Sequence, residues 1–188
     1  MSRIHLTNRR LLLILALALG AVIIAFGHLN DVLKKHQPGL YSVNRFIDGD
    51  TIIVNMNGHT EKIRFIGVDT PETHKPNTPV QCYGPAAAAF TKSTIGHSRV
   101  RLVSDSLSTD RDRYGRLLRY VYLPNGTNVD QELIRTGHGF YYPYFPFTKT
   151  KQFAAAEQSA IASHIGLWAS CHPTPSDNGG YKMDEPAA

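Results

Sequence analysis

Three short segments with β-strand character, close together in the chain, constrain its fold most. Residues 41–47 (YSVNRFI), 51–56 (TIIVNM) and 62–68 (KIRFIGV) are rich in β-branched and aromatic residues, which favour strands. Asn57-Gly58 lies between the second and third segments and is a strong signal for a two-residue hairpin turn. These residues therefore predict a meander of three strands.

Helix and strand signals continue after the meander. Residues 84–95 begin with Gly-Pro and are rich in alanine, and proline is favoured at the first position of a helix. Two more strands are expected at 99–104 and 116–123, and two more helices at 129–136 and about 149–165. This order predicts an α+β domain, a five-stranded, partly closed OB-type β-barrel with three α-helices, preceded by one N-terminal hydrophobic helix. Such barrels commonly hold nucleic acid on an outer face, but a fold alone does not identify a function.

The N-terminus carries a targeting signal. Three arginines within the first ten residues precede sixteen apolar residues, 11–26, that contain no charge. A basic flank before such a run is typical of a secretory signal peptide or a signal anchor. We therefore predict export, with residues 1–27 as either a cleaved signal peptide or a signal anchor in which residues 11–27 hold the protein on a membrane. The basic flank predicts that the N-terminus faces the cytoplasm and the domain lies outside.

The remaining chain is expected to form one domain. Residues 28–39 are interpreted as a polar linker, 40–172 as the domain, and 173–188 as a disordered tail rich in Pro, Ser, Asp, Asn and Gly. The net charge is +5, but the N-terminal arginines supply three of these charges. The small excess of positive charge in the rest of the chain is weak support for a polyanionic partner, so any basic surface must be local. A monomer is expected.

Cys82 and Cys171 are the only two cysteines of the sequence. They are too far apart for a CxxC redox or zinc motif. An even number of cysteines in an oxidising compartment favours a disulfide. Two unrelated thiols are the alternative. A zinc site that uses Cys171 and His172 is disfavoured because paired ligand spacing is missing.

Charged residues gather at three places beside the predicted strands: 48–51 (DGDT), 64–72 (RFIGVDTPE) and 112–116 (DRYGR). Each alone is typical of a turn or a cap. Together they offer oxygen ligands for a hard divalent cation, two arginines for a phosphodiester and a carboxylate that positions water. These groups form a set suited to phosphoryl transfer. Its members are Asp50, Asp69 and the Thr70 carbonyl for the cation, Arg64 and Arg116 for the phosphate, and Glu72 for the water.

This set requires a break in one strand. Arg64 and Asp69 are separated by an odd number of residues, so in a uniform strand their side chains point to opposite faces. They converge only if the strand ends or bulges between them. Gly67 is the predicted place.

The segments IDGDT, RFIGVDTPET, YGPAAAAFTK and DRYGRLLRYVY resemble the staphylococcal nuclease (thermonuclease) family in order and spacing, over about residues 40–169. The resemblance implies a Ca²⁺-dependent enzyme that hydrolyses DNA and RNA at the 5′ P–O bond and leaves 3′-phosphate ends. It also implies a cis peptide bond at Phe145-Pro146. For Phe140 and Phe147, in the same aromatic run, simple core packing is the preferred interpretation. By position it implies Asp50, Asp69 and Thr70 as calcium ligands, Asp48 behind them, Arg64 and Arg116 at the scissile phosphate, Glu72 as general base, and Arg113, Tyr114, Tyr142 and Tyr144 in the nucleotide pocket.

Two other classes of function compete with the enzyme. A non-catalytic OB-type module would bind nucleic acid or another protein, as superfamily members that keep the barrel and lose the site do. A calcium-dependent surface protein would explain the aspartates but leave Arg64, Glu72 and Arg116 without a role. All five catalytic and metal-binding side chains are present, and their joint presence favours the enzyme.

Overall fold

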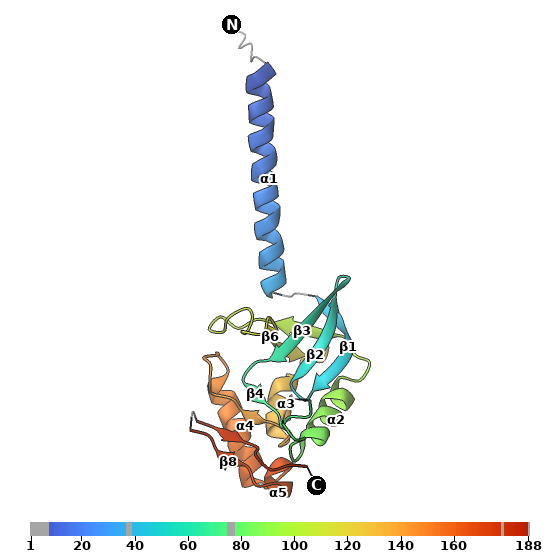
Figure 1. The fold of residues 1–188 in the computed structure, drawn as a ribbon, viewed down its shortest axis with the longest axis vertical. Coiled ribbons are helices and arrows are strands. Elements are labelled where there is room, and N and C mark those ends of the chain that lie inside the picture. Colours follow the sequence, from blue (N-terminus) through green and yellow to red (C-terminus); the bar gives the residue numbers. More distant parts are fainter. Residues whose placement is uncertain (1–7, 37–38, 75–77, 178, 188) are drawn as a thin grey trace. The chain divides into compact units, whose positions relative to one another are not determined.

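The computed structural model describes residues 8–36, 39–74, 78–177 and 179–187, which fall into two compact units divided after His36. In the first unit, α1 (Asn8–His36) is one continuous helix (Figure 1). It includes most of the predicted linker, because no glycine or proline between His28 and His36 ends it. No helix among the described residues has both the length and the apolar character needed to cross a membrane.

The second unit is built on a closed barrel with the strand order β1-β2-β3-β6-β5, which confirms the predicted five-stranded architecture (Figure 1). Asn57 and Gly58 both have positive φ angles, 54° and 90°, and form the predicted hairpin turn. A parallel pairing of β3 with β6 closes the barrel. The strands are β1 (Leu40–Asp48), β2 (Thr51–Met56), β3 (His59–Phe65), β5 (Val100–Val103) and β6 (Leu117–Tyr122).

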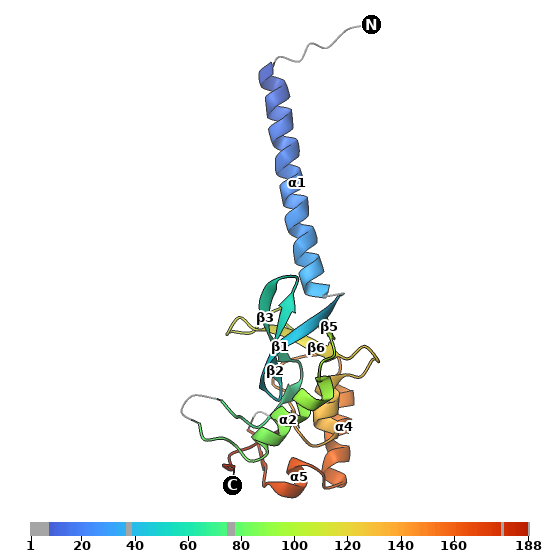
Figure 2. The same ribbon diagram turned by 90° about the vertical axis from the view of Figure 1, so that its right-hand side faces the viewer.

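Four shorter helices gather at one end of the barrel (Figures 1 and 2). They are α2 (Gly84–Ile95), α3 (Val129–Arg135), α4 (Thr150–Ala162) and α5 (Leu167–Ser170). Asn128 caps α3, since its side chain accepts a hydrogen bond from the Gln131 N–H. A short pair, β4 (Val68–Asp69) with β7 (Phe140–Tyr141), packs against α3 and α4. This pair and α5 were not predicted, because two- and four-residue elements carry little periodic signal.

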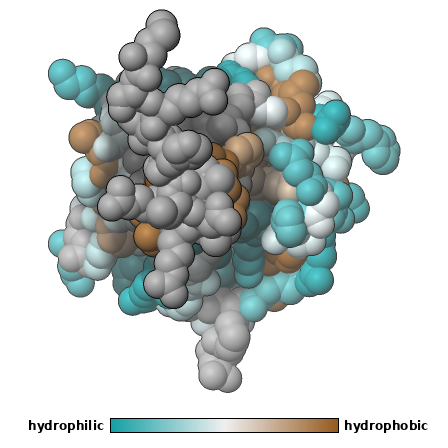
Figure 3. Space-filling view, turned by 90° about the horizontal axis from the view of Figure 1, so that it is seen from above, coloured by the Kyte–Doolittle hydropathy of each residue, from teal (hydrophilic) through white to brown (hydrophobic). Residues whose placement is uncertain are grey.

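Buried apolar side chains form two clusters. The larger one fills the barrel and extends to α3 and α4, with Ile52, Leu102 and Phe153 fully buried. The smaller one surrounds Phe140 and Trp168. In the view of Figure 3 most described side chains are hydrophilic, and the hydrophobic ones form small, separate patches. The described residues visible there therefore present no broad apolar surface.

The described residues of the C-terminal segment, which starts at Cys171, form strands and core contacts, in contrast to the disordered tail predicted for 173–188. The segment contains β8 (Thr174–Pro175) and β9 (Tyr181–Lys182), which pair with each other. The Tyr181 ring meets the Trp168 ring edge-on, with centroids 4.9 Å apart, and Met183 is buried in the smaller cluster. These few apolar contacts hold a segment whose overall composition is typical of disorder.

The predicted disulfide is confirmed. Cys82 and Cys171 are bonded, with a Cα–Cα distance of 6.2 Å, and neither of the two cysteines is free. The bond joins the residues before α2 to the end of α5. In the chain-entropy description a loop of this size stabilises the folded state by about 4–5 kcal/mol.

Glu157 of α4 is a buried carboxyl group whose protonation is coupled to stability. Its side chain accepts a hydrogen bond from the Tyr141 N–H at 2.9 Å and is almost fully buried. Burial raises its pKa to about 7, although the hydrogen bond from Tyr141 lowers it. Between its ordinary pKa and about 7 the folded state keeps a proton that the unfolded state loses. Stability is therefore lost as the pH rises through this window.

Replacing Glu157 with Gln keeps the acceptor oxygen and removes the buried charge. We expect the free energy of unfolding to rise by about 2–3 kcal/mol at pH 8 and to change little at pH 4. Urea unfolding at the two pH values measures the difference. Asp177→Asn, at an exposed position, is the control and should change neither value. An equal effect of Glu157→Gln at both pH values would contradict the assignment.

Candidate active site

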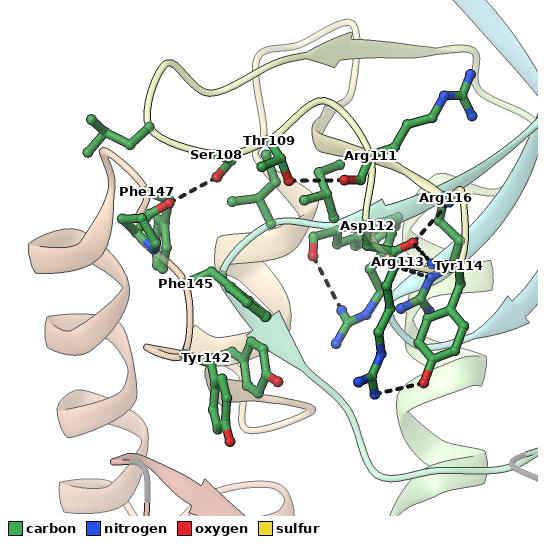
Figure 4. A pocket seen from close by; sticks show the side chains of 18 residues that line it. Ser108, Thr109, Arg111, Asp112, Arg113, Tyr114, Arg116, Tyr142, Phe145 and Phe147 are labelled. Carbon is green, nitrogen blue, oxygen red and sulfur yellow. Dashed lines mark hydrogen bonds and ion pairs between the residues drawn. The ribbon is translucent and has the colours of Figure 1, made fainter.

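A cavity of about 740 Å³ is enclosed by the turn after β3 and by two loops, 107–116 and 142–147. Figure 4 shows Arg113 and Tyr114 on one side of it and Tyr142 and Phe145 on the other. Three separate stretches of the sequence thus bring the predicted phosphate- and nucleotide-binding side chains to one place. Those that line the cavity are Arg64, Arg113, Tyr114, Arg116, Tyr142 and Tyr144.

The predicted break between Arg64 and Asp69 is present at Gly67. Strand β3 ends at Phe65, Gly67 has a φ of 71°, and β4 starts at Val68. A Cβ on Gly67 would lie 2.4 Å from the Phe147 ring, so the site excludes any side chain there. As a result Arg64 and Asp69 meet, with Nη2 and Oδ1 2.5 Å apart.

Asp130 of α3 supports this turn from behind. Its carboxylate accepts hydrogen bonds from the N–H groups of Ile66, at 3.0 Å, and Val121, at 2.8 Å. Burial raises the pKa of Asp130 to about 8, against the hydrogen bonds, which lower it. The sequence analysis missed this residue, because no local pattern shows that a helix carboxylate bonds to a distant turn and to strand β6.

Asp50 joins the same cluster from the turn between β1 and β2. It is buried, and its Oδ2 accepts hydrogen bonds from the Thr70 N–H at 2.8 Å and the Thr70 Oγ1 at 3.1 Å. The same oxygen lies 3.1 Å from Arg64 Nη1. The two predicted metal-binding aspartates therefore contact one guanidinium group.

Arg64 is held rigidly between these groups. Its Nη1 also donates to the Val68 carbonyl at 2.6 Å. Burial would lower the pKa of Arg64, but the negative charges of Asp50 and Asp69, together with that of Glu72, raise it above the ordinary value. Glu72 is thus close enough for its charge to act on Arg64, which brings the predicted base to the same cluster.

Asp48 lies nearby but has other partners. Within the described residues its carboxylate accepts a hydrogen bond from Thr73 Oγ1 and lies 3.3 Å from His74 Nδ1. It therefore supports the segment that follows Glu72. Its predicted place behind the metal ligands stays a prediction.

The aspartate pair fits a hard cation. Within the described part of the chain no group of three or more His, Cys, Asp or Glu side chains is arranged to hold a metal ion. The predicted set needs only two carboxylates, from Asp50 and Asp69, and a backbone carbonyl from Thr70. The carboxylates converge, as their shared contact with Arg64 shows, and the Asp69 side chain is 40% exposed. Oxygen ligands with positions left for water and phosphate suit Ca²⁺.

Arg116 is oriented by Asp112, a residue to which the sequence analysis assigned no role. Asp112 Oδ2 accepts from Arg116 Nε at 2.6 Å, and its Oδ1 accepts from the N–H groups of Tyr114 and Arg116 (Figure 4). Burial would raise the pKa of Asp112, but the hydrogen bonds and the charge of Arg116 bring it below the ordinary value. Within the described residues the hydrogen bonds of Arg116 use its backbone N–H and carbonyl and the side-chain Nε, which leaves both terminal amino groups of the guanidinium for a ligand.

Aromatic rings form the opposite wall. Tyr142 and Tyr144 are stacked, with centroids 5.5 Å apart and planes 11° apart, and Phe145 lies against both. Arg64 Cζ lies 6.0 Å from the centre of the Tyr142 ring, so the stacked pair adjoins the phosphate-binding arginine. Such rings can stack on nucleobases.

Three further expectations concern the same segment. Phe140 and Phe147 are buried, as predicted for core residues. The Phe145-Pro146 peptide bond is not cis, so that prediction was wrong. The Phe145 ring lies against the two tyrosines, and the trans form is the usual state of a bond before proline.

Comparison with known proteins gives concordant matches. The family described as Staphylococcal nuclease homologue matches residues 62–170. A thermonuclease of Staphylococcus intermedius is 48% identical over 116 residues, which cover 58% of this chain and 68% of the relative. A thermonuclease of Staphylococcus hyicus is 42% identical over 136 residues, covering 71% and 79%. The endonuclease YncB of Bacillus subtilis is 41% identical over 139 residues, covering 72% and 65%.

Proposed function

The chain belongs to the staphylococcal nuclease family, and from this membership and the site geometry we propose that it is a Ca²⁺-dependent nuclease of DNA and RNA. Its relatives include thermonucleases and an endonuclease, and the chain is a hydrolytic nuclease. One observation carries the assignment. Two arginines and an aromatic wall line one cavity, beside a cluster of carboxylates at Arg64.

The cavity is suited to bind one nucleotide with its phosphate. Arg64 and Arg116 bind the oxygens of the scissile phosphate, and both are oriented in advance by carboxylates. Tyr142 and Tyr144 offer a face on which a base stacks. Arg113, whose Nη2 donates to the Tyr114 hydroxyl at 2.8 Å, adds a positive charge on the opposite wall. Preorganised cations of this kind stabilise the charge that develops at phosphorus.

Asp50, Asp69 and the Thr70 carbonyl would hold Ca²⁺. Once bound, the ion supplies positive charge beside the phosphate. Glu72 accepts a proton from the water that attacks phosphorus. The bond from phosphorus to the 5′ oxygen breaks, this oxygen takes up a proton and leaves as a 5′-hydroxyl, and the other product keeps a 3′-phosphate. This direction of cleavage follows the pattern typical of the family.

The non-catalytic binding module is the competing hypothesis. A binder needs cations and aromatic rings, but it has no need for three carboxylates around one of its phosphate-binding arginines. The charges of Asp50, Asp69 and Glu72 all act on Arg64. The catalytic hypothesis gives each of these clustered carboxylates a role, and the binding hypothesis does not.

The products of digestion test the direction of cleavage. We expect fragments of a 5′-labelled single-stranded oligonucleotide to carry 3′-phosphates, because the proposed site breaks the 5′ P–O bond. Treatment with a phosphatase that removes 3′-phosphates should shift their electrophoretic mobility. A mobility that does not change, together with 5′-phosphates on the other fragments, would contradict the proposed chemistry.

We also propose that the domain acts outside the cytoplasm. The basic, apolar N-terminal segment supports this location, as does the Cys82–Cys171 disulfide, because such bonds persist in oxidising compartments. A reporter enzyme fused after Ala188 should be active outside the cytoplasm. Activity confined to the cytoplasm would contradict export.

A further inference from the structure

The backbone of Glu72 is held by one residue, Gln81, through its side chain and its backbone. Gln81 Oε1 accepts a hydrogen bond from the Glu72 N–H at 2.7 Å, and the Gln81 N–H donates to the Glu72 carbonyl at 2.9 Å. Both polar groups of the Glu72 backbone are thus paired with one residue. These bonds take the place of the backbone hydrogen bonds that a strand would make, since Glu72 lies between β4 and α2.

The other end of the Gln81 amide is bound to the C-terminal segment. Gln81 Nε2 donates to the Met183 carbonyl. On either side of Gln81, the Cys82 N–H donates to the Glu185 carbonyl at 2.8 Å and the Ala187 N–H donates to the Val80 carbonyl at 2.7 Å. The C-terminal segment therefore runs alongside residues 80–82 and bonds to the residue that holds Glu72.

The C-terminal segment is itself fastened at several points. Met183 is 3% exposed, and the Tyr181 ring packs on Trp168. The disulfide joins Cys82, next to Gln81, to Cys171, where the segment begins. A chain of contacts thus leads from the smaller core cluster through the C-terminal segment and Gln81 to Glu72.

We propose that Gln81 is a positioning residue for Glu72 and that the C-terminal segment 171–187 acts as part of the active-site support by holding Gln81. The assignment of a catalytic role to Glu72 rests on the proposed function. A primary amide suits the position, because it accepts from one backbone and donates to another at the same time. A general base must be held within about 0.5 Å of its productive position, and a segment outside a strand needs such a device.

The test combines two substitutions in the full-length chain. Gln81→Met keeps the length of the side chain and removes both of its hydrogen bonds. We expect kcat to fall about tenfold while KM changes less than twofold. In the Glu72→Gln background, the same Gln81→Met change should lower kcat by less than twofold, because the base through which it acts is already gone. Gln158→Met, on the exposed face of α4, is the control and should leave both parameters unchanged.

A second measurement does not require activity. Hydrogen exchange of the Glu72 amide should accelerate in Gln81→Met, and to a lesser degree in Met183→Ala, which loosens the C-terminal segment. Exchange of the barrel amides at Ile63 and Val121 should stay as in the parent, which shows that the fold is intact.

The possible results separate the two proposals. A parent protein without nuclease activity would refute the proposed function, and the exchange rates would still decide whether Gln81 and the C-terminal segment hold Glu72. Equal losses of kcat from Gln81→Met in both backgrounds would overturn the positioning role. So would an unchanged exchange rate at Glu72 when Met183 is replaced.

Discussion

Replacement of Arg116 with alanine is expected to lower the turnover of single-stranded DNA by about a hundredfold or more, since loss of one preorganised donor commonly costs this much. Arg116 lines the cavity, and its Nε is held by Asp112 at 2.6 Å, so its remaining donors are directed before the substrate arrives. The residue lies outside the Asp50, Asp69 and Thr70 set, so Ca²⁺ affinity should change little. Steady-state kinetics and calorimetric titration with Ca²⁺ measure the two effects.

Arg135→Ala provides the matched control. Arg135 is an arginine of α3 with a carboxylate partner of its own, since its Nη2 lies 2.6 Å from Glu132 Oε2. It does not line the cavity. Its removal should leave turnover within twofold of the parent. Equal turnover in the Arg116→Ala and Arg135→Ala variants would contradict the phosphate-binding role of Arg116.

The second large effect is expected for Glu72→Gln. Glutamine keeps the size and the hydrogen-bonding shape of the side chain and removes its ability to take a proton. We expect turnover to fall by a factor of about 100 or more, while the affinity for single-stranded DNA stays nearly constant, because the base acts on the attacking water and not on the bound strand. Single-turnover cleavage and fluorescence anisotropy with the same oligonucleotide separate the two quantities.

Glu132→Gln is the corresponding control for Glu72. It removes a carboxylate of α3 whose partner is Arg135, away from the cavity, and should leave turnover unchanged. If Glu72→Gln lowered DNA affinity in proportion to turnover, Glu72 would be a binding residue. If it changed neither quantity, the proposed base would be wrong.

Features with a local cause could be predicted from the sequence. The hairpin at Asn57-Gly58 follows from the positive φ angles that a two-residue turn requires. The convergence of Arg64 and Asp69 follows from strand periodicity and from the single glycine between them. The order of strands and helices was sufficient to predict the five-stranded barrel.

Most features that the sequence did not predict depend on contacts between residues far apart in the chain, and one depends on a loop conformation. The order of the C-terminal segment depends on the packing of Tyr181 and Met183 against Trp168 and its neighbours. The role of Gln81 depends on the Met183 carbonyl, 102 residues away. Asp112 belongs to the charged segment 112–116, but its hydrogen bonds to Arg116 depend on the loop conformation at Gly115, whose φ is 77°. Composition and spacing describe neighbours in the chain, whereas the partners of the C-terminal segment and of Gln81 are far from them in the sequence.

The same contacts decide which part of the chain should be purified. A fragment that stops at residue 172 would lose Met183 and Glu185, which bond to residues 81 and 82. The compact unit 37–188 keeps them.

Degradation of single-stranded DNA by the unit 37–188, with Ca²⁺ and after its removal by a chelator, tests the central claim most directly. The account predicts rapid cleavage with Ca²⁺, loss of cleavage when the ion is chelated, and recovery when Ca²⁺ is restored in excess. Asp69→Asn should need a higher Ca²⁺ concentration for half-maximal activity, because it removes one of two carboxylate ligands. A protein that binds the DNA equally well with and without the chelator and cleaves none of it would contradict the enzyme assignment. The binding module would then be the function.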